Sequence, residues 1–149
     1  MDQVNELWIG EIPAHQLASF EALLADFGVH SCASRVNLSS SFTIQSSSEI
    51  EQALRASLAS ELSKLSCPFE LLHIGLMGER YAFVPHLGLH RCDLNEIGEE
   101  LLSYSRFESL IESSNGSNRE LRRLVDLALG KPWIEALDLI RSRSERRVA

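Results

Sequence analysis

The chain has 149 residues and a net charge of −7, with 44% hydrophobic and 23% charged residues. This length and balance predict one globular domain with a substantial core. They exclude a membrane-spanning helix, because no apolar run approaches the ~18 residues that such a helix needs. The acidic start MDQVNELW also differs from a signal peptide. We therefore expect a cytoplasmic protein.

The charge is unevenly distributed along the chain. The tail RSRSERRVA (141–149) has four Arg and one Glu and carries +3. The other 140 residues carry −10, which is the difference between −7 and +3. An acidic body with a short basic tail is poorly suited to a phosphate backbone, so we do not expect a nucleic-acid partner, and the lack of a long apolar run argues against a membrane partner. The alternatives for the tail are contact with nucleic acid, with an anionic partner or with the acidic body itself. A tail of this kind is typical of a solvated helix end.

The first elements predicted along the chain are a strand and a helix. LWIGEI (7–12) is typical of a short buried strand, and Pro13 ends it. A helix follows the strand, because apolar residues recur at three- and four-residue spacing along one face. Gly28 is placed to end this helix. The residues of that face are Leu17, Phe20, Leu24 and Phe27.

The next segment predicts a hairpin and a second helix. Apolar and polar residues alternate around a serine-rich turn, which favours a hairpin with one buried face. Ser48 and Glu51 have capping-box spacing. The apolar positions of the hairpin are Val36, Leu38, Phe42 and Ile44, and those of the helix are Ile50, Leu54, Leu58, Leu62 and Leu65. Cys67-Pro68 then ends the helix.

Two further strands complete a predicted α+β fold. FELLHIGL (69–76) is one strand, a turn follows at 77–79, and the second strand covers 79–90. The order βαββαββ fits a ferredoxin-like antiparallel sheet made of two split βαβ units, with 79–90 as an extra edge strand. Two arrangements would protect this edge: pairing with its own copy, which would give a homodimer, or coverage by the last helices.

The C-terminal part is predicted to be helical. One helix covers 94–113 and ends at the polar turn SSNGSN (113–118). Asn118 caps the next helix, Gly130 ends it, and Pro132 opens the last one at the position that tolerates its missing N–H. The apolar residues Trp133, Leu137 and Ile140 are expected to be buried. We therefore expect one domain, residues 1–149, with the sheet and two helices in 1–92 and the helical part in 93–149.

The stretch GERYAFVPHLGLHRC (78–92) is the main candidate for chemistry. If it is one strand, then His86, His90 and Cys92 face the same side, and these residue types ligate zinc. Histidines four residues apart on a strand lie ~13 Å apart, however, so they cannot share an ion unless the strand bends. We favour a polar strand face and assign no metal ligand. The three cysteines, Cys32, Cys67 and Cys92, are expected to be reduced thiols.

No pattern for catalysis is present. The chain lacks a GxSxG elbow and a glycine-rich phosphate loop, so we assign no catalytic or cofactor-binding residue and expect no cofactor. LWIGEIP (7–13) is similar to the first strand of an RNA recognition motif. SSSFTIQ (40–46) lacks the basic-glycine-aromatic pattern of the RNA-binding strand, so RNA binding is disfavoured. An alternative is an enzyme or small-molecule binder with a pocket between the sheet and the C-terminal helices, lined by His86, His90 or Arg80.

Two segments resemble one known family. GERYAFVPHLG (78–88) is similar to a GERYxFxPxLG segment, and LGKPWIEALDLIR (129–141) is similar to LGKPWxxxLxxxR. Both segments are found in an actinobacterial family catalogued as domain of unknown function 3145. In that pattern the positions of His86 and His90 are not histidine. The resemblance implies a small cytoplasmic protein without assigned catalytic residues. It also implies an accessory role near fatty-acid synthesis, around acyl chains or acyl-carrier protein.

The resemblance directs attention to four residues as an interaction surface, Arg80, Tyr81, Lys131 and Trp133. Arg80 and Lys131 are the cations that would meet an acidic protein partner, next to the two aromatic rings. Each has a structural alternative: Arg80 begins a strand, Tyr81 and Trp133 anchor the core, and Lys131 fills a corner. The sequence thus predicts a non-catalytic interaction protein with a protein partner.

Overall fold

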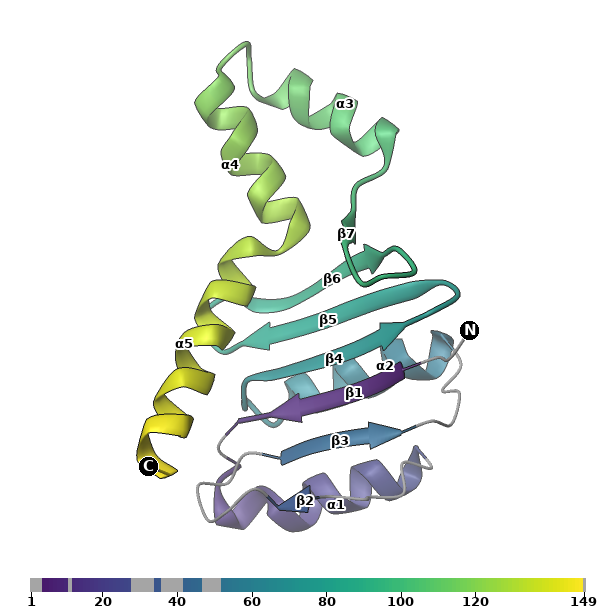
Figure 1. Ribbon diagram of the computed structural model, residues 1–149, viewed down its shortest axis with the longest axis vertical. Helices are drawn as coiled ribbons and strands as arrows, with labels where there is room; N and C mark the ends of the chain where they lie inside the picture. The colour runs from purple at the N-terminus through teal and green to yellow at the C-terminus, as the bar shows by residue number, and fades with distance from the viewer. Residues whose placement is uncertain (1–3, 11, 28–33, 36–41, 47–51, 149) are drawn as a thin grey trace.

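The computed structural model describes residues 4–10, 12–27, 34–35, 42–46 and 52–148 (Figure 1). Its strands are β1 (Val4–Ile9), β2 (Ser34–Arg35), β3 (Phe42–Ser46), β4 (Phe69–Ile74), β5 (Gly78–Val84), β6 (Gly88–Leu94) and β7 (Glu100–Leu101). Its helices are the short 3-10 helix η1 (Ala14–Gln16), α1 (Leu17–Asp26), α2 (Gln52–Ser63), α3 (Tyr104–Ser113), α4 (Asn118–Leu129) and α5 (Lys131–Val148). The predicted capping box at Ser48 and Glu51, Gly28, Cys32 and the strand residues Val36 and Leu38 lie outside the described residues.

The strands form one seven-stranded sheet in the order β2-β3-β1-β4-β5-β6-β7. All neighbouring strands are antiparallel. From β4 to β7 the strands follow one another as a meander, because short turns join them. The α+β class and the C-terminal helices are confirmed, and the ferredoxin-like assignment stays a prediction.

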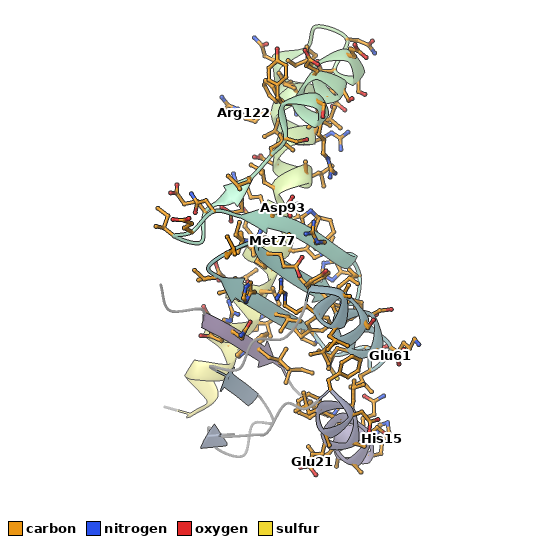
Figure 2. All side chains as sticks on the ribbon, turned by 90° about the vertical axis from the view of Figure 1, so that its right-hand side faces the viewer. His15, Glu21, Glu61, Met77, Asp93 and Arg122 are labelled. Atoms are coloured by element: carbon orange, nitrogen blue, oxygen red, sulfur yellow. The ribbon has the colours of Figure 1, made fainter. Side chains whose placement is uncertain are left out.

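The sheet has a core on each face. Helices α1 and α2 cover one face, where they pack on Leu7, Ile9 and Leu71 of β1 and β4. Helix α5 covers the other face, where Leu137 packs on Trp8, Ala82 and Val84. Figure 2 shows α1 and α2 on one side of the sheet and α5 on the opposite side, with His15, Glu21 and Glu61 pointing away from the sheet. Because side chains alternate along each strand, neighbouring residues of one strand belong to the cores on opposite faces of the sheet.

The stretch predicted as one edge strand at 79–90 is two strands, and that prediction was wrong. Pro85 lies in a turn between β5 and β6, where the amide of Leu87 donates to the carbonyl of Val84 (2.9 Å). Gly88 takes the positive φ of 85° that the turn requires. β5 pairs with β4 and β6 and therefore lies inside the sheet, whereas β7 pairs only with Asp93 and Leu94 of β6. The homodimer through this segment stays a prediction.

The predicted helix at 94–113 is also shorter in the structure. The Asn95 side chain accepts hydrogen bonds from the amides of Ile97 and Glu99, and Gly98 has a φ of 88°. This turn redirects the chain into β7, and α3 begins only after Ser103, whose hydroxyl accepts from the Arg106 amide. The sheet therefore continues past residue 92, the predicted end of its region.

Helices α3 and α4 form an arm that extends beyond the sheet (Figure 1). The turn between them contains Asn115 and Gly116 at positive φ, in agreement with the predicted polar turn. Ser117, rather than Asn118, caps α4 by accepting from the Glu120 amide. None of the described helices is long and apolar enough to cross a membrane.

Candidate interaction site at the corner between α4 and α5

Two side chains from the sheet cap the end of α4. The Arg80 guanidinium on β5 donates to the carbonyl of Leu129 (2.8 Å), and His90 Nε2 on β6 donates to that of Ala128 (3.0 Å). Carbonyls in the last turn of a helix have no partner within the helix, so these bonds satisfy groups that would otherwise need water. The sheet therefore holds the arm at a fixed position.

The start of α5 is attached to the same place. Gly130 ends α4 in the left-handed conformation, with a φ of 80°. Trp133 Nε1 then donates to the Gly88 carbonyl at 2.9 Å, and its ring lies 4.6 Å from the imidazole of His90. We call the set Arg80, Gly88, His90, Gly130 and Trp133 the joint.

The joint is a partly buried polar cluster, in which Arg80 and Gly130 are buried and the other three residues are half-buried. Arg80 Nη1 pairs with Glu100 of β7 at 2.7 Å, and the hydrogen bond from Arg80 lowers the pKa of that carboxyl. Burial lowers the pKa of His90, and the positive charge of Arg80 lowers it further. His90 is therefore neutral near pH 7, with its proton on Nε2. Arg80 Nε and His90 Nδ1 are buried without a hydrogen-bond partner among the described residues.

Tyr81 lies on the opposite face of β5, in the core beneath α1 and α2. Its hydroxyl is 3.4 Å from the carboxylate of Glu79, which is 1% exposed. Glu79 forms ion pairs with Arg55 of α2 and Arg91 of β6, both at 2.7 Å. Burial raises the pKa of Tyr81, and the charge of Glu79 adds to the effect. The ion pair between Arg55 and Glu79 therefore links α2 to the sheet.

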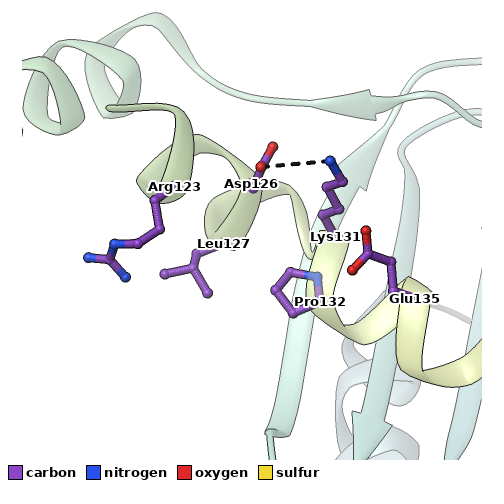
Figure 3. Close-up of a pocket in the computed structure, with 6 residues that line it drawn as sticks. All are labelled: Arg123, Asp126, Leu127, Lys131, Pro132 and Glu135. Carbon is purple, nitrogen blue, oxygen red and sulfur yellow. Dashed lines mark ion pairs between the residues drawn. The ribbon is translucent and has the colours of Figure 1, made fainter. Parts of the chain in front are cut away.

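A groove of about 360 Å³ lies on the outer side of the corner (Figure 3). Its lining combines apolar side chains with both signs of charge. Lys131 Nζ lies 3.8 Å from Asp126 Oδ2 across the corner. We call it the corner groove, and its lining residues are Arg123, Asp126, Leu127, Lys131, Pro132 and Glu135.

The four residues singled out from the sequence do not form one surface. Arg80 and Trp133 meet in the joint, whereas Tyr81 is buried on the other face. Lys131 is exposed and lines the groove. The rest of the groove lining was missed. Its signal within α4 is the four-residue spacing of Arg123 and Leu127, which places them on one side of that helix. Glu135 lies on α5, beyond the break at Gly130, so no local spacing connects it to them.

The candidate metal ligands are also separated. His86 lies exposed in the β5–β6 turn, whereas His90 and Cys92 are on β6, so the premise that all three share one strand face was wrong. The part of the chain that the structure describes contains no group of three His, Cys, Asp or Glu residues that could hold a metal ion. Cys67 and Cys92 are buried free thiols, and burial raises the pKa of both.

A family model described as "Protein of unknown function (DUF3145)" matches residues 33–148. The chain belongs to this family. The matched range includes both segments that form the joint, 78–88 and 129–141. Comparison with curated proteins and with solved structures gives no match. For this DUF3145 member, the function must be inferred from the site itself.

Proposed function

We propose that this protein is a non-catalytic interaction protein that binds a protein partner at the corner groove. The observation that supports the proposal is that the two family-like segments meet at the corner that carries the groove. Arg80 and Gly88 of the first segment bond to Leu129 and Trp133 of the second. A surface held in one geometry loses less conformational entropy on binding, so a fixed corner favours recognition of a partner.

The groove lining indicates the chemistry of the partner. Leu127 and Pro132 offer an apolar surface, and Arg123 and Lys131 are cations beside it. Arg123 pairs with Glu120 at 2.6 Å and Lys131 with Asp126 at 3.8 Å, so the groove discriminates by the positions of charges rather than by net charge. A protein segment with an apolar side chain between two carboxylates would fit. Its ion pairs at this exposed site contribute specificity more than affinity.

An accessory role in fatty-acid or acyl-chain metabolism is the finer part of the proposal, and the family resemblance supports it. An acidic carrier protein is the partner class that this role suggests. The net charge of −7 repels such a partner at long range. Arg123 and Lys131 would have to attract it locally. Binding should therefore be kept or strengthened by moderate salt, which screens the long-range repulsion.

The test is an affinity purification of the tagged full-length protein from its own cells, followed by mass spectrometry. The partner is then purified and its binding measured by isothermal titration calorimetry. We expect Lys131→Glu and Arg123→Glu to weaken binding at least tenfold. Lys64→Glu is the matched control, because the Lys64 side chain is 66% exposed, against 58% for Lys131, and also pairs with a nearby carboxylate. Equal binding by all three variants would reject the corner groove as the site.

A small-molecule site is the second candidate, and the groove volume is the observation that favours it. A volume of about 360 Å³ falls within the range of ligand pockets. The corner groove is not the predicted pocket between the sheet and the C-terminal helices, because Arg80 and His90 bond to the end of α4 and His86 is in a turn. A metabolite that binds the groove should raise the melting temperature, and Lys131→Glu should remove that increase.

A further inference from the structure

Helix α3 carries an apolar stripe that the described part of the chain leaves uncovered. Tyr104, Phe107 and Ile111 recur at three- and four-residue spacing and are 75%, 36% and 45% exposed. α3 has no buried residue. α4 covers α3 on another side, where Leu110 is half-buried and Ser114 is buried. A helix with a strongly amphipathic face normally packs that face against another element.

The charges of the arm indicate what covers the stripe. α3 has one Arg and two Glu and a net charge of −1. α4 has three Arg, one Glu and one Asp and a net charge of +1. The arm is therefore neutral, whereas the whole chain carries −7. Two copies repel each other through their bodies but not through their arms, and the extension of the arm beyond the sheet keeps the bodies apart (Figure 1).

We infer that the α3 stripe binds a second copy of this chain. The two arms pack around a two-fold axis, with α3 of each copy against α4 of the other, and four helices share one apolar centre. Helical spacing places Glu108 and Glu112 beside the stripe, on the side away from Leu110. Their counterparts on the partner's α4 are the exposed Arg119 and Arg122, and Figure 2 shows Arg122 extending outward from the arm. This inference is independent of the partner proposed for the corner groove.

The first experiment is sedimentation velocity of the full-length protein over a range of concentrations. We expect a reversible monomer–dimer equilibrium. Phe107→Ser with Ile111→Ser should raise the dimer Kd at least about a hundredfold, because each substitution acts twice in a two-fold dimer. Leu139→Ser is the matched control, since Leu139 is a 58% exposed apolar residue of α5. Circular dichroism checks that each variant is folded.

A charge exchange tests the orientation of the two arms. Glu108→Arg with Glu112→Arg makes both helices of one variant basic, and Arg119→Glu with Arg122→Glu makes both helices of the other acidic. Each variant alone should dimerise at least tenfold more weakly than the natural chain. A mixture of the two should dimerise as well as the natural chain, because every α3–α4 contact then joins opposite charges. A monomer at all concentrations, or a dimer that neither set of substitutions weakens, would overturn the inference.

Discussion

Gly130 lies directly against the imidazole of His90. A Cβ atom at residue 130 would be only 2.7 Å from His90 Nδ1 and 3.2 Å from Arg80 Nη2. Gly130 also has a φ of 80°, which residues with a Cβ rarely adopt. The glycine of the LGKPW segment is thus required for two reasons, the left-handed turn that ends α4 and the close approach of the helix corner to the sheet.

Gly130→Ala should lower the free energy of unfolding by more than the cost of placing an alanine at a positive φ. Gly116→Ala is the matched control, because Gly116 has the same φ of 80° and has no atom within 4 Å of the position of a Cβ. We expect a cost of about 1–2 kcal/mol at Gly116 and about 1–2 kcal/mol more at Gly130. Urea unfolding of both variants measures the difference. Equal costs would show that the contact with His90 and Arg80 is easily relaxed.

His90 should make the stability of the protein depend on pH. Burial lowers its pKa below the usual value of 6.5, so the unfolded chain binds more protons than the folded chain between those two pKa values. Stability therefore falls as the pH drops through this window and is retained above it. His90→Gln keeps an N–H donor for Ala128 but does not titrate. The stability advantage of the natural chain over this variant should shrink as the pH falls from about 7 to below the unfolded value of 6.5. A constant difference would contradict the prediction.

Glu79→Gln should be strongly destabilising. The substitution removes the carboxylate that faces Arg55, whose side chain is 5% exposed, and leaves the guanidinium buried beside a neutral amide. Loss of one partner from a buried ion pair costs about 3–5 kcal/mol. Glu61→Gln removes the carboxylate of an exposed pair with Lys64 and should cost less than about 1 kcal/mol. Thermal and urea unfolding compare the two. A mild effect at Glu79 would show that other groups or water stabilise the Arg55 guanidinium.

Trp133 should act mainly as an anchor of the joint. Trp133→Phe keeps an aromatic ring but loses the hydrogen bond to Gly88, which should cost about 1 kcal/mol. Trp133→Ala also removes the contact with His90 and the packing on the second core, and should cost about 3 kcal/mol. Urea unfolding measures both. An alanine variant as stable as the natural chain would assign Trp133 to an interaction surface instead of the core.

The sequence predicted those elements whose signals lie within a few residues. Short apolar runs identified β1 and β4, three-to-four spacing identified α1 and α2, and Gly130 and Pro132 marked the corner. Each signal arises from local geometry: side chains alternate along a strand and recur every turn of a helix, and a left-handed cap needs glycine. The same rules gave the wrong result at 78–94. There Val84-Pro85-His86-Leu87 is a turn, but its apolar residues resemble a continuing strand.

The tertiary structure decided which residues meet. Glu79, Arg80 and Tyr81 are consecutive, yet the pleat directs Arg80 to the joint and the other two to the core under α2. Arg80 also bonds Leu129, forty-nine residues away. No local pattern encodes such a contact, because it depends on where the sheet places β5 relative to the end of α4. The sequence therefore determined the helices, most of the strands and the corner, and the packing of α4 and α5 on the sheet decided that Lys131 faces a groove and Arg80 does not.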